Sequence, residues 1–481
     1  MPRLVTALCA LVFAAPRVHA ATTTVGPGDS YEPIEAARPG DEVLLLPGTY
    51  PFRVYLTTAA PADRPIVIAA ADPSHPPVFD LGGTFVEDAP GSYTGGDRGR
   101  GCWQISGGTN YQISGIVFTH CSNADANSAG LRYYNGASGI VLRNCVFRDN
   151  DNGLTGGSED SDITVESSEF DGNGNLAAPS EAPTHNIYVY GGTFTLRYSY
   201  LHDPVQGQNF HIRSRNGTLE YNWIARAHSY EGDLMTDDDF SVLSPPYTQA
   251  LLLRGNVIIQ SAAPENHGQI IAVYNDAGIA GLSLDLRLVS NTVVGNGGEA
   301  ALVHLSNADG TSMGAELSNN IISGTLVPTL VEEEATAMVS GQNNWIESGA
   351  DPGPLTGSVQ SADPGFRDPS AKDFTLAASS LALGGASPSV EGLPDREYYK
   401  DETQTCMYRL RTAVKDIGAF ESTTTGLGLQ VNSSGSPKGG ASPGGCGSSG
   451  GSLSLPGVLL LLVWLGRRSC ASCRCAPGSF G

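Results

Sequence analysis

A six-residue pattern returns along the middle of this sequence: an aliphatic residue, two variable positions, Asn or a small polar residue, one variable position, then an aliphatic or aromatic residue. The polar position steps by 23, 31, 23, 34, 35 and 29 residues, counted over Cys145, Ser168, Ser199, Asn222, Asn256, Asn291 and Asn320. A period of this length, built on short alternating segments, is typical of a solenoid whose turns contact only their neighbours. We therefore predict coils of three short strands, with loops projecting from the longer coils.

The repeated polar position predicts an internal ladder along the solenoid. Apolar core positions flank it, so its side chain must find hydrogen-bond partners away from water. Stacked amides can bond to one another and to turn backbone, and we expect Asn222, Asn256, Asn291 and Asn320 to share one column. The alternative fold is a β-sandwich with asparagine-rich turns, but its strands would not repeat at one spacing.

Composition supports an all-β fold over residues 21–421. The 60 Gly and 30 Pro leave little scope for long helices and suit many turns. Only residues 31–37 have the pattern of a helix, which is short and closed by Pro39 and Gly40. We expect this helix to cover the open end of the first coil, because a terminal repeat needs a cap.

The charge of the chain excludes two classes of partner. A formal net charge of −22 argues against nucleic acid and anionic membrane surfaces, since both require basic patches. The only lysines are Lys372, Lys400, Lys415 and Lys438, all of which follow the repeats. A mechanism based on a lysine inside the repeats is therefore excluded.

The first residues have the pattern of a secretory signal. Arg3 precedes an apolar run over residues 4–15, and Val18, His19 and Ala20 form a small-residue cleavage site. The apolar run is too short to span a membrane, so we expect residues 1–20 to be removed on export. Four cysteines, Cys102, Cys121, Cys145 and Cys406, then remain where disulfides persist, and their spacing leaves pairing or buried thiols equally open.

The C-terminal part changes composition sharply. Residues 422–452 are mostly Gly, Ser and Thr, which predicts a flexible linker, and residues 453–481 begin with an apolar stretch ending in Arg467 and Arg468. The segment GGCGSSGG, which contains Cys446, together with that stretch and the Arg pair, resembles the myxobacterial C-terminal sorting tail. The resemblance implies cleavage near Cys446, a lipid on this cysteine and retention at the cell surface. The alternative is a simple membrane tail anchor or an unprocessed extension.

Three longer segments resemble right-handed parallel β-helix proteins of the pectin-lyase-like superfamily. They are PGDEVLLLPGTYP with RPIVIAAADP near the start, HNIYVYGGTFTLRYSYLHDPVQGQNFHIRSR in the middle, and SADPGFRDPSAKDFTLAASSLALGGA with KDIGAFE near the end. The resemblance implies a single-stranded right-handed parallel β-helix. It is weakly specific for a reaction, because this fold hosts lyases, hydrolases, epimerases, adhesins and binders.

Aligning two coils on Ser199 and Asn222 brings polar residues together on an outer face. Tyr188 then pairs with His211 and Tyr190 with Arg213, while Ile187, Val189, Phe210 and Ile212 point into the core. Aromatic rings beside His and Arg suit an acidic sugar polymer, although a solvated face of cross-strand pairs is the alternative. The same face is expected to receive His185, Asn186, Arg215, Ser241, Tyr274 and His304.

The loop HSYEGDLMTDDDF carries a carboxylate cluster. Several carboxylate oxygens can bind Ca²⁺, and the candidate ligands are Glu231, Asp233, Asp237, Asp238 and Asp239. The loop does not match an EF-hand, and a solvated acidic loop is the alternative. We expect no organic cofactor.

These residues predict a polysaccharide lyase-like protein that acts on an acidic polysaccharide by β-elimination. The superfamily's lyases typically use Lys or Arg as base, often with Ca²⁺; here His211 is the candidate base, Tyr188 the acid and Arg213 the carboxylate clamp, with Arg215 as its substitute. Two other functions stay open: a non-catalytic glycan-binding or adhesive surface protein, and a glycoside hydrolase that uses a carboxylate pair. We expect a monomer.

Overall fold

The computed structural model describes residues 20–179, 182–236, 247–263, 265–266, 268–275, 281–298, 300–306, 311–324, 329–333, 337–398, 407–411, 413–422 and 430–431. The predicted signal peptide except Ala20, most of the predicted linker, Cys446 and the predicted anchor tail lie outside the described residues. In the described residues, no helix is long and apolar enough to cross a membrane.

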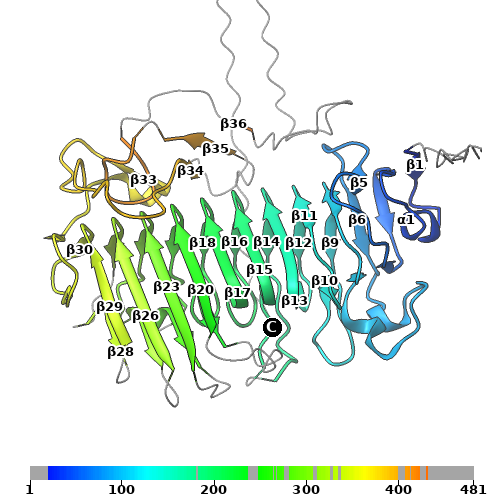
Figure 1. Cartoon of the computed structure of the whole chain (residues 1–481), viewed down its shortest axis with the longest axis horizontal. Coiled ribbons are helices and arrows are strands. Elements are labelled where there is room, and N and C mark those ends of the chain that lie inside the picture. The colour runs from blue at the N-terminus through cyan, green and yellow to red at the C-terminus, as the bar shows by residue number, and fades with distance from the viewer. Residues whose placement is uncertain are drawn as a thin grey trace, which may run out of the picture. The chain divides into compact units, whose positions relative to one another are not determined.

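The fold is a right-handed parallel β-helix, as predicted, and its coils lie side by side in chain order (Figure 1). The coils between the two ends each contribute one strand to each of three faces. Strands of the first face are β1 (Thr22–Val25), β2 (Glu42–Leu45), β5 (Ile66–Ala70), β8 (Tyr111–Ser114), β11 (Ile140–Arg143), the second halves of β13 (Asn152–Glu166), β15 (Ile187–Arg197) and β17 (Phe210–Glu220), then β20 (Tyr247–Arg254), β23 (Leu282–Val289), β26 (Ser312–Ser318) and β29 (Ala337–Gln342).

The second face consists of short strands, most of them three residues long. They are β3 (Gly48–Tyr50), β6 (Pro77–Asp80), β9 (Val117–Thr119), β12 (Val146–Arg148), β14 (Glu169–Asp171), β16 (Tyr200–His202), β18 (Trp223–Ala225), β21 (Val257–Ile259), β24 (Thr292–Val294), β27 (Ile321–Ser323), β30 (Trp345–Glu347) and β31 (Val359–Ser361). Their inward side chains stack in register, as the rings of Phe79, Phe118, Phe147 and Phe170 do.

The third face carries the candidate site. It consists of β4 (Val54–Leu56), β7 (Trp103–Ser106), β10 (Ala129–Tyr134), the first halves of β13, β15 and β17, then β19 (Gly232–Met235), β22 (Gln269–Tyr274), β25 (Ala301–Ser306) and β28 (Val331–Glu333). The long strands β13, β15 and β17 turn the corner from the third face to the first without a break.

A short helix, α1 (Glu32–Glu35), lies near the start of the solenoid, inside the range that the sequence predicts. It places Ile34 in the core of the first coil, where this side chain is fully buried. The described residues also contain three short 3₁₀ helices, η1 (Val86–Asp88), η2 (Gly96–Arg100) and η3 (Pro369–Ala371).

The predicted asparagine ladder is confirmed. The Nδ2 of Asn222 donates to Oδ1 of Asn256 at 3.0 Å, and the same contact links Asn256 to Asn291 and Asn291 to Asn320. The ladder continues by one rung to Asn344, which the sequence pattern did not identify. Each amide also donates to a backbone carbonyl, so the column closes the hydrogen bonding of one turn in every coil.

A ladder of alternating charge crosses the outside of the first face. Glu166 is fully buried between two arginines, with Arg143 Nε at 2.6 Å and Arg197 Nε at 2.7 Å from its two oxygens. Glu220 lies one coil after Arg197 and accepts a hydrogen bond from Arg254 Nε at 3.0 Å. Burial alone would raise the pKa of Glu166, but Arg143 and Arg197 outweigh it and the pKa lies below its usual value.

The coils end at β31, so the prediction of one unbroken β-helix to residue 421 is wrong for residues 362–421. In that range β32 (Phe366–Asp368) pairs antiparallel with β33 (Asp373–Leu376). In the same way β35 (Met407–Leu410) pairs with β34 (Arg396–Tyr398) and with β36 (Gln430–Val431), which lies farther along the chain. Phe374, Tyr398 and Phe420 pack on Trp223 and Val257, which point outward from the second face. These C-terminal strands and their loops, the C-terminal module, therefore cover apolar side chains on the outside of the solenoid.

One disulfide is present among the described residues, between Cys102 and Cys121. Cys145 is buried as a free thiol in the polar position of its coil, and burial raises the pKa of this thiol to about 11. Cys406 lies outside the described residues.

Candidate functional site

Two adjacent columns of outward side chains run along the third face, and the predicted cluster contains residues of both. Tyr188 pairs with His211 and Tyr190 with Arg213, as the coil alignment predicts. The alternating residues Ile187, Val189, Phe210 and Ile212 are fully buried in the core, again as predicted. Parallel pairing in register thus brings a tyrosine, a histidine and an arginine from β15 and β17 to one place.

His211 is held between a carboxylate and a guanidinium. Its Nδ1 lies 2.9 Å from Oδ1 and 3.1 Å from Oδ2 of Asp233, which is the next residue along the same column on β19. Its Nε2 accepts from Arg213 Nε at 2.9 Å. Because arginine only donates, Nε2 carries a lone pair and Nδ1 carries the proton toward Asp233. This tautomer is the one that a histidine general base requires at Nε2.

The neighbouring groups fix these three side chains. Arg213 Nη1 donates to the carbonyl of Thr236 at 2.7 Å, and the Tyr230 hydroxyl donates to Asp233 Oδ2 at 3.1 Å. Asp233 is fully buried, while His211 and Arg213 are 7% and 8% exposed. The cluster is therefore preorganised and nearly desolvated, with a small opening to solvent.

Aromatic rings enclose His211 on two sides. His185 stacks on it with ring centroids 4.8 Å apart, and Tyr188 meets it edge to face at 4.6 Å. The Arg213 guanidinium carbon lies 6.0 Å from the Tyr188 ring centroid. Burial, followed by the nearby His211 and Arg213, holds the pKa of His185 well below its usual value, so His185 is a neutral partner.

Three other predicted residues lie outside the cluster, two on the third face and one beyond its edge. Tyr274 follows Met235 in the column of Arg213, and its ring lies 5.8 Å from that of His304. His304 is three coil steps beyond His211 in its column and pairs with Glu332 at 3.2 Å. Arg215 sits beyond the corner of β17, where its guanidinium pairs with Glu159 at 3.8 Å.

Two predicted site residues lie inside the solenoid instead of on its surface, which corrects their assignment. Asn186 donates to Asn209 Oδ1 at 2.8 Å, and Asn209 donates in turn to Glu231 Oε2 at 2.8 Å. Both oxygens of Glu231 accept from donors in this second internal ladder, including Asn266. Burial raises the pKa of Glu231 to about 7. Asn186 is thus no sugar ligand, and Glu231 is no loop ligand for a cation.

Asp233 is the second predicted calcium ligand that the structure reassigns, because its carboxylate contacts Nδ1 of His211. Of the remaining candidates, Asp237, Asp238 and Asp239 lie outside the described residues, and so does Ser241. The described residues hold one group that could ligate a metal, namely Glu169, Asp171 and His202 on the second face. Burial would lower the pKa of His202, but Asp203 and Glu169 raise it to about 9. His202 pairs with both carboxylates, so the group forms an ion-pair cluster and is also a candidate metal site.

Three functional positions escaped the sequence reasoning: Asp233 as the partner of His211, and Tyr230 and Thr236 as supports. A signal for Asp233 was present, because it follows His211 by 22 residues, one short coil, and so falls on the same column. The sequence held no comparable signal for Tyr230, whose contact depends on how the turn before β19 folds.

The sequence matches no protein-family model and no curated protein. Among solved structures, the fold is similar to pectate lyase Pel9A, with 15% identity, a TM-score of 0.44 and coverage of 83% of this chain and 96% of that one. It is similar to an alginate lyase from Paenibacillus sp. str. FPU-7, with 14% identity, a TM-score of 0.42 and coverage of 71% and 99%. It is also similar to an alpha-1,3-glucanase from Streptomyces thermodiastaticus, with 14% identity, a TM-score of 0.36 and coverage of 72% and 70%. Likenesses at this level carry no argument about the reaction, which we infer from the side chains.

Proposed function

We propose that this protein is a polysaccharide lyase-like protein that cleaves an acidic polysaccharide by β-elimination on its third face. The observation that carries the proposal is the chain of contacts from Asp233 through His211 to Arg213. A buried carboxylate holds one ring nitrogen, and the other nitrogen is kept as an acceptor beside a guanidinium. These are the parts needed to take a proton next to a bound carboxylate.

The proposed step balances with the groups at hand. His211 Nε2 takes the proton from C5 of a uronate, and the electron pair left on that carbon forms a double bond to C4. The bond between C4 and the glycosidic oxygen breaks, and the Tyr188 hydroxyl gives its proton to the leaving oxygen. Arg213 binds the uronate carboxylate and stabilises the negative charge that develops on it. A proton passes from His211 back to Tyr188, directly or through water, to reset the site.

The contact between Arg213 and His211 gives the site its selectivity for acidic sugars. In the free protein, Arg213 Nε occupies the lone pair of His211 Nε2. A carboxylate can draw the guanidinium into a bidentate pair, which is stronger than a bond to a neutral ring. Binding of a uronate then frees the base at the moment it is needed, whereas a neutral sugar leaves Nε2 occupied.

The same contact also favours the second candidate function. Because His211 and Arg213 are nearly buried and bonded to each other, the face could hold acidic glycans without cleaving them. In that case the protein is a glycan-binding or adhesive surface protein, and retention on polymers without cleavage is the expected behaviour.

Replacing Arg213 with alanine tests the proposed clamp. We expect the KM for acidic polymers to rise by about 10- to 100-fold, since a charge-assisted contact contributes about 1.5–3 kcal/mol. The assay is ultraviolet absorbance of the new double bond with alginate, polygalacturonate and chondroitin as substrates. Arg148→Ala is the control, because Arg148 is exposed on the second face. An unchanged KM in Arg213→Ala would place the clamp elsewhere.

We further propose that the protein is exported and kept at the cell surface through its C-terminal tail. The Cys102–Cys121 disulfide supports export, because such bonds persist in oxidising compartments. Mass spectrometry of the protein from the producing cells should give an N-terminus at Ala21 and a lipid on a fragment that ends near Cys446. An intact N-terminal segment, or an unmodified full-length tail, would contradict this part of the proposal.

A further inference from the structure

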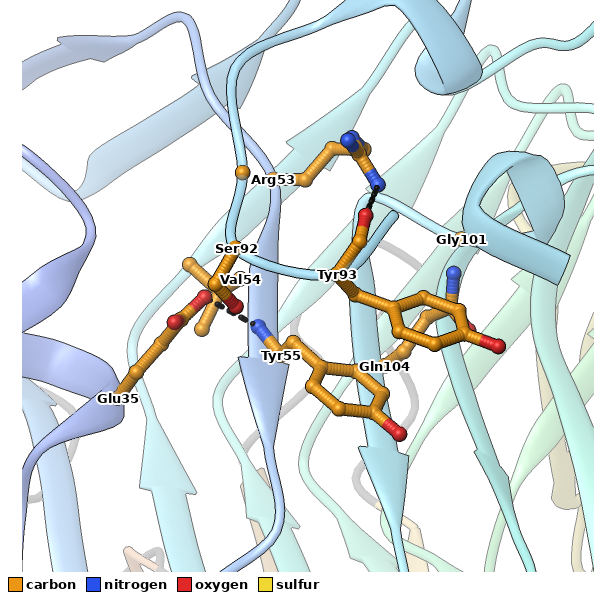
Figure 2. A pocket seen from close by; sticks show the side chains of 9 residues that line it. Glu35, Arg53, Val54, Tyr55, Ser92, Tyr93, Gly101 and Gln104 are labelled. Carbon is orange, nitrogen blue, oxygen red and sulfur yellow. Dashed lines mark hydrogen bonds between the residues drawn. The ribbon is translucent and has the colours of Figure 1, made fainter. Parts of the chain in front are cut away.

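A cluster of tyrosines lies at the N-terminal end of the third face, away from the cluster around His211. Tyr55 on β4 stacks on Tyr93 with ring centroids 4.4 Å apart and an interplanar angle of 11°. Figure 2 shows the two rings facing each other with their hydroxyls pointing the same way. Both tyrosines are half-buried, so each keeps some ring surface open to solvent.

The loop that carries Tyr93 is held in place by buried side chains. Arg53, 7% exposed, donates from Nε to the carbonyl of Ala89 and from Nη1 to those of Tyr93 and Arg98 (Figure 2 shows the Tyr93 bond). Gln104, 2% exposed, donates to the carbonyls of Asp97 and Arg98. A buried arginine and a buried glutamine thus fix an insertion of the β-helix so that it presents one aromatic ring.

Polar and charged groups surround the stacked pair. The Tyr134 hydroxyl donates to Gln104 Oε1 at 3.0 Å, which places a third tyrosine in the cluster. The Arg132 guanidinium carbon lies 4.5 Å from the Tyr134 ring centroid, and Arg132 also lies 3.6 Å from Asp97. Half-buried Tyr55 and Tyr93, with the partly exposed Arg132 guanidinium, offer aromatic surface, hydroxyls and positive charge that suit an acidic sugar, while Tyr134, 7% exposed, supports them from below.

The pairing of strands connects this cluster to His211. Tyr55 belongs to the same outward column as His211, and the column runs through the intervening pairs Tyr55–Gln104, Gln104–Arg132, Arg132–Thr155, Thr155–Tyr188 and Tyr188–His211. At about 4.8 Å for each step, the two clusters are roughly 24 Å apart along the solenoid axis. That distance spans several sugar rings. Between the two clusters, these outward positions hold the small residues Thr155 and Gly157, whose side chains project little from the third face.

We infer that Tyr55, Tyr93 and Tyr134, with Arg132, form a remote sugar-binding subsite for the acidic polymer that the His211 cluster cleaves. The inference rests on the proposed function and adds to it a direction and a minimum length for the substrate. A polymer lies along the third face, parallel to the solenoid axis, and reaches both clusters at once. Short oligosaccharides occupy the His211 cluster alone.

The test compares long and short substrates in the Tyr93→Ala variant of the full-length protein. With alginate or polygalacturonate we expect the KM to rise roughly 2- to 10-fold, because one aromatic contact is lost. With the tetrasaccharides of the same polymers we expect KM and kcat to stay unchanged. Tyr93→Phe keeps the ring and should restore the KM for polymer. Phe85→Ala is the matched control, since Phe85 is an exposed aromatic residue of the same insertion.

An unchanged KM for polymer in Tyr93→Ala, or an equal rise for the tetrasaccharides, overturns the inference. If the wild-type protein cleaves neither polymer, retardation of the native protein in gels that contain each polymer replaces the kinetic readout. Retardation that Tyr93→Ala weakens and Phe85→Ala does not then supports the subsite although the lyase proposal has failed. Equal migration of the wild type and Tyr93→Ala in those gels overturns the subsite.

Discussion

Replacing His211 with alanine should abolish β-elimination while leaving the fold intact. General-base catalysis contributes about 10²- to 10⁴-fold, and the variant has no other group where Nε2 stood. His211 projects outward from β17, so its loss leaves the core residues Phe210 and Ile212 in place. The measurement is kcat on an acidic polymer by ultraviolet absorbance, with circular dichroism to check the fold.

A second variant separates catalysis from stability, because His211→Ala leaves buried Asp233 without the ring that it bonds. His211→Asn keeps a side-chain donor near the position of Nδ1, so it preserves the contact with Asp233 and removes only Nε2. We expect the same loss of activity from both variants. His75→Ala is the matched control, since the side chain of His75 is 73% exposed in a turn between β5 and β6. Full activity in His211→Asn would show that the base lies elsewhere.

Replacing Glu166 with alanine should strongly lower the free energy of unfolding. Its carboxylate is fully buried and bonds to both Arg143 and Arg197, and removing it leaves two partly buried cations facing each other. Breaking a buried ion pair from one side costs about 3–5 kcal/mol in the free energy of unfolding. Urea unfolding followed by circular dichroism measures the loss.

The control for Glu166 is an ion pair on the same face with greater exposure. Arg287 and Glu316 pair at 2.9 Å, but their side chains are 28% and 35% exposed, so Glu316→Ala should cost about 1 kcal/mol or less. The effect of the Glu166 carboxylate also depends on pH. Because the folded-state pKa of Glu166 lies below its usual value of 4.5, its stabilisation is present above that pH and is lost as the pH falls through the folded-state pKa. Equal losses in both variants at neutral pH would contradict the buried ladder.

The periodic parts of the fold could be predicted from the sequence. The step between Ser199 and Asn222 fixed the register of two coils, and the pairs Tyr188–His211 and Tyr190–Arg213 followed from it. The asparagine column followed because a polar residue between core positions has few ways to satisfy its amide. Both predictions rest on repetition, which a solenoid transmits directly from sequence to structure.

The parts that repetition does not govern were missed. Asn173 and Asn186 come from the two ends of one lengthened turn, so the second ladder has no constant spacing that reveals it. Glu231 looked like a loop carboxylate because the sequence gives no measure of burial. The packing of the C-terminal module was missed because Trp223 and Val257 occupy the variable, outward position of the repeat, and the residues that cover them lie far along the chain.

Cleavage of an acidic polymer in water enriched in heavy oxygen is the most direct test of β-elimination on the third face. The proposed step adds no water to the sugar, so the wild-type protein should release products that carry a double bond and no heavy oxygen, and His211→Asn should release none. Mass spectrometry of the products distinguishes the outcomes. Heavy oxygen at the new reducing end would show hydrolysis and would contradict the elimination that we propose.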